Sequence, residues 1–343
     1  MTIFKKSKTG LLICFIIGTI ITSSCVRADL NTCSKGVDVQ FNYSYNMLNS
    51  NAFGEKADRV ILYVFDKDRL LIAQKTVEGP EVTNDLRISL PDITPGKFFF
   101  AAVAQSTNIE NPYADFEIPD LTIGESEPDD LCIGLKLSAD RVQNHELNDL
   151  LIGYTPADIT YSSKARTVTV NMKKVNRKIR IVLLPMRTAV QPSDLPLFDF
   201  NIIDPVGNEH IDYKYEQIPG GAVTYKPYFQ AITYPRNGET LPENEITGAA
   251  IAEINTARLI TVNKPKLIIT NKTTQKEMIK VDLTWFISLI EMKNNTAKWS
   301  LQEYLDREDE YTFSFFFDSD TDTWLQTTII INGWIISLDD IEL

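Results

Sequence analysis

Alternation of apolar and polar residues dominates this chain, and it predicts β-strands. Apolar residues at the odd positions of 37–45 alternate with polar ones, as in a strand that buries one face. Residues 60–65 and 97–105 are almost continuously apolar, which is typical of central strands covered on both faces. Further strands are predicted at 86–90, 167–172, 178–184, 198–203, 211–215, 223–232, 258–262, 266–270, 278–283, 311–317, 328–331 and 334–338.

Helical signals are few and short. Segments 128–137, 144–151 and 284–291 favour helices, and Ser300 with Glu303 has the spacing of a capping box at the start of another short helix. Many short strands with few helices predict an all-β fold of two tandem β-sandwiches. We place the domain boundary at the polar joint 173–176, which gives an N-terminal β-sandwich over 37–174 and a C-terminal β-sandwich over 175–343.

The first residues indicate export and a lipid anchor. Lys5, Lys6 and Lys8 precede the apolar run 11–21, and small residues lead from it to Cys25. A helix of about eleven residues spans about 16 Å, roughly half of a bilayer's hydrocarbon core. We therefore expect residues 1–24 to be a lipoprotein signal peptide, Cys25 to carry the lipid, and 25–36 to form a tether. The alternative is an ordinary signal peptide, since Thr22 occupies a position where lipoproteins prefer Leu.

The charge of the chain is acidic. Its 34 basic and 46 acidic residues give a net charge of −12, and removal of 1–24 would take away three lysines and no acid. Such a chain has no electrostatic attraction to nucleic acid or to anionic lipid headgroups. The lipid is therefore the membrane attachment that we predict.

Cys33 and Cys132 remain after Cys14 is lost with the signal peptide. Export favours a disulfide between them, and two free, buried thiols are the alternative. Neither cysteine has the spacing of a zinc site.

Catalytic and metal-binding patterns are scarce. The two histidines, His145 and His210, lie far apart in the sequence, and no nucleophile or nucleotide-binding motif occurs. Asp318, Asp320 and Asp322 are a weak calcium candidate, because an EF-hand loop would need Gly and Glu where Thr323 and Ile329 stand. A polar hairpin is the favoured interpretation. We expect no enzyme activity, no cofactor and no small-molecule substrate.

Several segments carry a family resemblance, and the run Gln302–Tyr311 is the most specific of them. The others are Cys25 followed by Cys33 and 37–46, then 57–66, 95–99, 149–153, 167–181 and 331–334. Together these segments resemble the FimB-type fimbrial anchor lipoproteins of type V pili. For Gln302–Tyr311 itself, capping by Ser300 and local charge pairing favour a structural role over a binding site.

The resemblance implies two tandem transthyretin-like β-sandwiches, attached to the outer membrane by lipid and facing outward. Such a protein would hold the base of a fimbria to the cell, bind its fimbrillin stalk subunit and help to limit its length. Related stalk subunits lose an N-terminal strand by proteolysis, whereas an anchor keeps its own. Alternatives are a surface glycan-binding lipoprotein, a minor tip or adhesive subunit, and a hydrolase.

The C-terminal segment is the expected stalk contact. Asn332-Gly333 lies between two β-prone stretches, which is a strong hairpin signal. The resemblance suggests that the last strand, with Trp334, Ile336 and Leu338, contacts the stalk subunit by strand exchange. The alternative is that this hairpin only completes the second sandwich.

Overall fold

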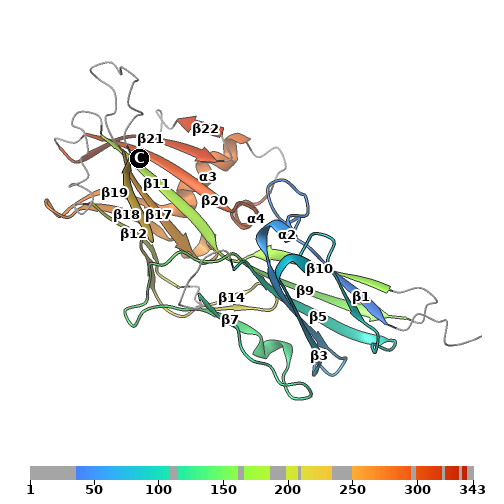
Figure 1. The fold of residues 1–343 in the computed structure, drawn as a ribbon. Coiled ribbons are helices and arrows are strands. Elements are labelled where there is room, and N and C mark those ends of the chain that lie inside the picture. Colours follow the sequence, from blue (N-terminus) through green and yellow to red (C-terminus); the bar gives the residue numbers. More distant parts are fainter. Residues whose placement is uncertain are drawn as a thin grey trace, which may run out of the picture.

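The computed structural model describes residues 36–107, 115–160, 166–185, 198–207, 210–233, 249–294, 299–318, 321–331 and 334–337 (Figure 1). Strands arranged in four sheets make up most of this part of the chain, and the α-helices are short. The all-β prediction is confirmed.

The first half of the chain forms a seven-stranded sheet in the order β3-β2-β5-β9-β10-β1-β4. Its strands are β1 (Val37–Asn42), β2 (Arg59–Phe65), β3 (Leu71–Glu78), β4 (Arg87–Leu90), β5 (Gly96–Gln105), β9 (Leu150–Ile159) and β10 (Arg166–Lys174). One hydrophobic cluster joins residues of β2 and β5 to residues of β1 and β10, so the sheet folds back over its own core. The short helix α2 (Phe53–Lys56) adds Phe53, whose ring stacks on Phe41 at 5.1 Å.

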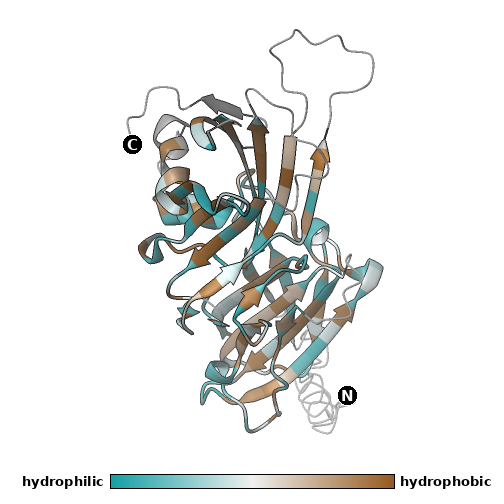
Figure 2. Cartoon of the chain, turned by 90° about the vertical axis from the view of Figure 1, so that its left-hand side faces the viewer, coloured by the Kyte–Doolittle hydropathy of each residue, from teal (hydrophilic) through white to brown (hydrophobic). Residues whose placement is uncertain are grey.

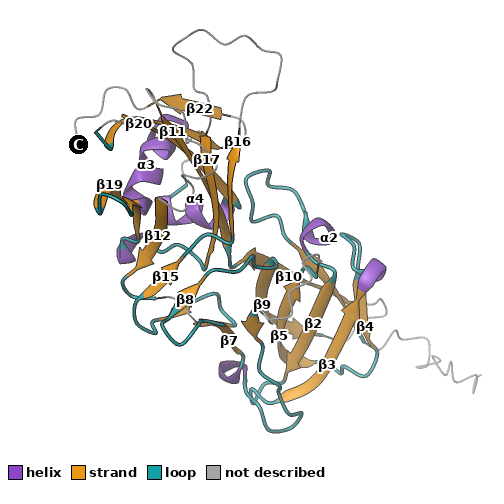
Figure 3. Ribbon diagram, turned by 60° about the vertical axis from the view of Figure 1, so that its left-hand side comes forward, coloured by secondary structure: helices purple, strands orange, loops and turns teal. Residues whose placement is uncertain are grey.

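The second half of the chain builds two more sheets. One is six-stranded, in the order β16-β17-β11-β20-β21-β22, and the other is five-stranded, in the order β19-β18-β12-β15-β8. Their strands in this half are β11 (Arg177–Pro185), β12 (Phe198–Asp204), β15 (Val223–Tyr225), β16 (Phe229–Thr233), β17 (Ala249–Thr256), β18 (Lys266–Asn271), β19 (Lys276–Asp282), β20 (Glu310–Asp318), β21 (Thr323–Ile331) and β22 (Trp334–Ser337). Helices α3 (Leu283–Asn294) and α4 (Leu301–Arg307) lie between β19 and β20 in the sequence (Figure 3).

Strands from the middle of the first half cross over to the second. β7 (Cys132–Leu135) pairs with β13 (His210–Asp212), and β8 (Val142–Gln143) pairs with β15. β6 (Phe116–Glu117) and β14 (Gln217–Ile218) complete the four-stranded sheet. A second hydrophobic cluster contains buried residues from both halves, and Figure 2 shows apolar strands on each side of the junction. The two halves therefore share a core.

The joint between the halves is short. β10 ends at Lys174 and β11 begins at Arg177, so Val175 and Asn176 alone connect the two sheets. Both residues are buried. The polar joint expected at 173–176 is thus a connection inside the protein.

The helix prediction for 128–137 is wrong in most of its length. A 3-10 turn covers Pro128–Asp130, and the following residues form β7. The turn has the capping box of Glu127 and Asp130. The 3-10 turn ends after three residues, because the residues that follow it form β7 and pair with β13.

The helix prediction for 144–151 is also wrong. These residues are extended and lead into β9, because distant side chains hold their backbone: Leu147 N–H donates to Asn255 Oδ1 and Leu150 N–H donates to Asn176 Oδ1. Gly153 lies farther along β9. The Cβ of any larger residue at this position would come within 2.6 Å of Met172 Sδ.

The remaining differences concern strands. Segment 258–262 is not a strand, and it runs into the 3-10 turn Thr261–Asn263. Segment 223–232 is divided between β15 and β16. β3, β9 and β17 were not predicted from the pattern. The helix at 284–291 is confirmed within α3, and so is the cap on α4, where Ser300 Oγ accepts from Glu303 N–H.

Candidate functional site

The register of β1 fixes where the chain enters the fold. β1 is parallel to β10, with Val37 beside Arg166 and Asn42 beside Asn171. Since β10 runs toward the joint with the second half, β1 begins at the opposite end of the sheet. Any attachment that precedes Val37 therefore meets the molecule at the pole remote from the second half. Cys25 and Cys33 lie outside the described residues.

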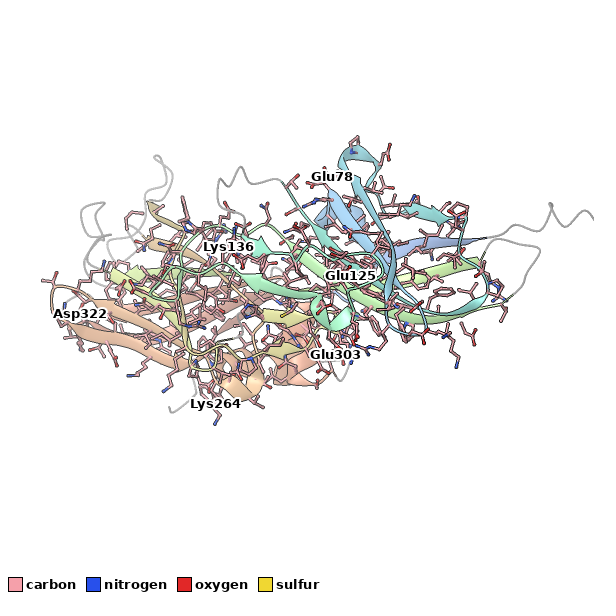
Figure 4. The ribbon with its side chains drawn as sticks, turned by 90° about the horizontal axis from the view of Figure 1, so that it is seen from below. Glu78, Glu125, Lys136, Lys264, Glu303 and Asp322 are labelled. Carbon is pink, nitrogen blue, oxygen red and sulfur yellow. The ribbon has the colours of Figure 1, made fainter. Side chains whose placement is uncertain are left out.

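The second half repeats this arrangement and extends in the other direction. β11 is parallel to β20, with Lys178 beside Glu310 near the joint and Pro185 beside Phe317 at the far end. Figure 4 shows Asp322 at that far end and Glu303 of α4 near the middle of the molecule. The molecule thus has two poles, one where β1 begins and one at the turn after β20.

The far pole is held by contacts between two hairpins. Asp322 accepts hydrogen bonds from Asn271 Nδ2 at 3.0 Å and from Thr274 Oγ1 at 3.0 Å. Lys276 Nζ donates to Thr321 O at 2.6 Å. The polar-hairpin interpretation of Asp318, Asp320 and Asp322 agrees with these contacts, although Asp320 lies outside the described residues. Within the described part of the chain, no group of three metal-ligating side chains occurs.

The C-terminal hairpin forms the edge of the six-stranded sheet. β22 is antiparallel to β21, with Trp334 beside Ile331 and Ser337 beside Thr328. In the described structure β22 has one strand neighbour, and Figures 1 and 3 show it on the outer edge of the sheet, away from the seven-stranded sheet. Trp334 and Ile336 therefore belong to an edge strand, and Leu338 follows it outside the described residues. Contact with a stalk subunit stays a prediction.

The run Gln302–Tyr311 lies at the junction of the two halves, where it surrounds Arg177. The Arg177 side chain is fully buried, and its guanidinium donates to the carbonyls of Leu305 (2.9 Å), Asp306 (2.7 Å), Lys174 (2.9 Å) and Asn176 (2.9 Å). A further bond goes to Tyr215 Oη at 3.2 Å. One side chain thus connects the end of α4 to the joint between the sheets.

Asp306 is held by a second arginine. Arg258 Nε and Nη2 donate to its two carboxylate oxygens, each at 2.6 Å, which is the bidentate geometry that arginine favours. Gln302 Nε2 donates to the same carboxylate at 3.1 Å. Asp306 is 3% exposed, so this pairing compensates its desolvation.

Asp309 ties α4 to the first half. Its carboxylate accepts from Tyr43 Oη at 2.8 Å and lies 2.8 Å from Lys56 Nζ and 3.8 Å from Lys174 Nζ. Burial alone would raise the pKa of Asp309, but Lys174 and Lys56 outweigh it and hold the pKa at about 2. Burial outweighs the effect of Arg177 at the neighbouring Glu308 and raises its pKa to about 7.

Arg307 completes the contact with the first half. Its guanidinium donates to Asn46 O at 3.2 Å and to Asn49 Oδ1 at 3.0 Å, and it stacks over the rings of Tyr45 and Trp299. The whole run therefore acts as a clamp between the halves. The structural interpretation of Gln302–Tyr311 is the one that these contacts support.

Sequence reasoning missed the clamp's partners, above all Arg177, Tyr43 and Lys56. The pairs Arg177–Leu305 and Tyr43–Asp309 are 128 and 266 residues apart. No periodicity links such positions. The one available signal was the density of charge in Gln302–Tyr311 next to a predicted buried strand.

The other candidate residues are dispersed. His145 is exposed after β8, while His210 begins β13, so the two histidines lie on separate segments. Cys132 is partly buried, and this burial raises the pKa of its thiol. Since Cys33 lies outside the described residues, their disulfide stays a prediction. No helix among the described residues is long and apolar enough to cross a membrane.

Comparison with known proteins identifies one family model that matches residues 30–340. It is Mfa2, the fimbrillin-A associated anchor proteins Mfa1 and Mfa2. A search of curated proteins gave no match.

Solved structures match over most of the chain. A candidate adhesin from Bacteroides thetaiotaomicron is 28% identical with a TM-score of 0.74, covering 89% of this chain and 98% of that one. A candidate polysaccharide-binding protein from the same organism is 24% identical with a TM-score of 0.71, covering 89% and 99%. The fimbrial anchor protein Mfa2 from Porphyromonas gingivalis is 16% identical with a TM-score of 0.61, covering 89% and 99%, which shows the same fold.

Proposed function

This chain belongs to the Mfa2 family of fimbrillin-A associated anchor proteins, and we propose that it is a lipoprotein that holds a type V pilus at the outer membrane. In this role it binds the fimbrial stalk subunit, limits the length of the pilus and performs no catalysis. The observation that carries the proposal is the opposite placement of the two attachments. The chain enters at one pole through β1, and the C-terminal hairpin lies on an outer edge of the other half.

The lipid on Cys25 supplies the membrane attachment. Val37 lies twelve positions after Cys25, and a fully extended chain over twelve such steps spans at most about 40–43 Å. The lipid would therefore hold the start of β1 within this distance of the membrane. Cys25→Ala is expected to move the protein from the membrane fraction to the soluble fraction, or to leave it as unprocessed precursor. Cys14→Ala is the matched control, because Cys14 is removed with the signal peptide.

The edge of β22 suits a stalk subunit. An edge strand presents unpaired backbone groups, and a partner strand can satisfy them while apolar residues on alternate positions give specificity. The β-prone sequence of β22 would be an aggregation hazard without a cover. A stalk subunit that pairs with this segment, or receives it into its own groove, provides that cover.

The place of β1 explains how an anchor limits length. β1 is paired on both sides, with β10 and with β4, so its own place in the first sheet is not open to another donor strand. A subunit that keeps this strand cannot accept a further subunit at its membrane pole. Strand-to-strand growth therefore stops at the anchor.

Two truncations test the stalk contact in native cells. Deletion after Ser337 removes Leu338 and the five residues beyond it, and deletion after Ile331 also removes β22. Cells with either truncated protein should shed pili into the medium, and the second truncation should cause the greater loss. The protein itself should stay lipidated, and its resistance to protease should show that it is still folded. Full retention of pili by the folded, β22-deleted protein would refute the stalk role of this strand.

The function as a whole is tested by removing the protein. Cells without it should release pili that are longer than those of the parent, and pili retained at the surface of parent cells should carry this chain at the base. If the pili stay attached and unchanged in length, the anchor function is wrong.

A further inference from the structure

The outer ends of the two terminal strands lie toward opposite poles of the molecule. β1 begins at the pole remote from the second half, because Val37 lies beside Arg166 at the start of β10. In the second half, β21 is antiparallel to β20, and β22 is antiparallel to β21. β22 therefore runs away from the joint, in the direction of β11 and β20. Figure 1 shows β1 and β22 in opposite parts of the molecule, so tension between its poles acts along both strands.

Tension would pull β1 along its length against two neighbours. β1 pairs with β10 over Val37–Asn42 and with β4 over Val37–Gln40. The hydrogen bonds of a ladder lie across the strands, so a pull along the strand loads all of them at once. A pull from the side would instead break them one after another. The N-terminal strand is therefore held in the stronger of these two geometries.

The pull on β1 reaches the second half by two routes. β10 continues into β11 through the two-residue joint, so one route is the covalent backbone. The other route begins just after β1, where Tyr43 Oη donates to Asp309 Oδ1 at 2.8 Å and Asn46 O accepts from Arg307 Nη1 at 3.2 Å. Asp309 directly precedes β20. The inner end of β1 is thus fastened to the beginning of β20.

β11 and β20 repeat the arrangement of β10 and β1. They are parallel, with Lys178 beside Glu310 at the joint and Pro185 beside Phe317 at the far pole. Tension pulls β11 from its first residue and β20 from its last, which again loads the ladder along its length. Each half therefore resists a pull between the poles with a pair of parallel strands.

β22 determines the direction in which the pull leaves the second half. Without it, the chain would leave the sheet at Ile331, which lies next to the beginning of β20 because Ile330 pairs with Thr312. A pull from that point toward the far pole would turn back along the sheet and peel β21 from β20, one bond after another. β22 begins at Trp334, beside Ile331, and returns the chain toward the far pole.

We propose that β22 is a mechanical lock, a strand that keeps tension between the poles directed along the strands of the second half. The inference rests on the proposed anchor function, because an anchored pilus is what pulls on both poles. It goes beyond that function, because it gives β22 a task besides contact with the stalk. β22 has one strand neighbour in the described structure and β1 has two, so β22 is the end that yields first. A stalk strand paired with its free edge would add a second ladder and strengthen this end.

Single-molecule force spectroscopy of the mature chain without its lipid tests the lock, with one handle fixed at the N-terminus. The second handle is attached to the same chain at one of three places: the C-terminus, position 332 between β21 and β22, or Thr321 between β20 and β21. Pulling from position 332 peels β21 from β20, so the first unfolding event should occur at no more than about half the force needed from the C-terminus. Thr321 is the matched control. It lies at the opposite end of β21 and pulls β20 from its last residue, so its force should be at least as high as that from the C-terminus.

A chain that ends after Ile331 gives a second measurement, since its C-terminal handle lies at the joint end of β21. This chain should unfold at the force found for position 332. Equal forces for position 332 and the C-terminus would overturn the lock, and so would a truncated chain that resists as much force as the parent. Both results would leave the anchor function standing, because no pili take part in them. Cells that keep normal pili without the protein would instead remove the source of the tension and overturn both proposals.

Discussion

Replacement of Arg177 by methionine should destabilise the protein more than replacement of any exposed arginine. Methionine fills the space of the alkyl chain but removes all five donated hydrogen bonds. In this variant the Lys174 carbonyl still accepts a hydrogen bond from Tyr215 Oη, and the Asp306 carboxylate still accepts hydrogen bonds from Arg258. The Asp306 carbonyl loses the one hydrogen bond that the described structure records for it.

The magnitude follows from burial. Breaking a buried, charge-assisted network by removing one partner costs about 3–5 kcal/mol. Total stabilities of about 5–15 kcal/mol are typical of folded domains, so the loss would be a large fraction of the whole. Because the network connects α4 to the joint at Val175 and Asn176, we also expect the two halves to unfold less cooperatively.

The assay is urea unfolding followed by tryptophan fluorescence, since Trp299 stacks on Arg307 of the clamp. Arg180→Met is the matched control. Arg180 lies on the same strand and pairs with Glu253, but the Arg180 side chain is 41% exposed. When Arg180 is replaced, Glu253 still has its ion pair with Lys178. The Arg180 end of the pair is exposed, and the buried Glu253 keeps its bonds from Lys178 and Tyr228, so the loss should be about 1 kcal/mol, the upper end for surface pairs. Equal losses in the two variants would refute the view that Arg177 organises the junction.

The other predictions concern charge and cysteine chemistry. Glu308 has a pKa raised to about 7, so its favourable contribution is complete below its unfolded pKa and is lost as pH rises through 7. Glu308→Gln should therefore raise the urea midpoint relative to the parent at pH 8 but not at pH 4, and equal shifts at both would contradict this. Asp309 has a pKa lowered to about 2, so it stabilises above its unfolded pKa and loses this effect as pH falls through 2. Asp309→Asn should cost about 2 kcal/mol at pH 7 and almost nothing near pH 2, which acid titration of the unfolding signal measures. Non-reducing peptide mapping of the mature protein should join the peptides of Cys33 and Cys132, and alkylation of both thiols in native protein would show that they are unpaired.

The features of this protein differ in how well they could be predicted from the sequence. The hairpin at Asn332-Gly333 could be predicted, because turn chemistry and strand alternation act over a few residues. The cap of Ser300 on α4 could be predicted for the same reason. Strand β3 could not be predicted, since its pattern is too polar to be recognised as a strand.

Residues 144–151 show where prediction of secondary structure from the sequence fails. Their spacing of leucines and acidic residues fits a helix, yet Asn255 and Asn176 bind their backbone and keep it extended. β17 likewise contains alanines and a glutamate that favour helices, and it is a strand because β11 and β16 pair with it on both sides. Tertiary hydrogen bonds outweighed local propensity in both cases.

The sequence by itself determined the all-β class, most of the long strands and the acidic charge, and it is the basis of the predicted export signal and lipid anchor. These properties depend on neighbours along the chain, which periodicity and composition record. The tertiary structure alone decided that 116–143 joins the sheets of the second half, that Arg177 lies beneath α4, and that the poles of the molecule are opposite. Those outcomes depend on partners more than a hundred residues away, because a buried charge or backbone group takes whichever donor or acceptor the packed sheets bring to it.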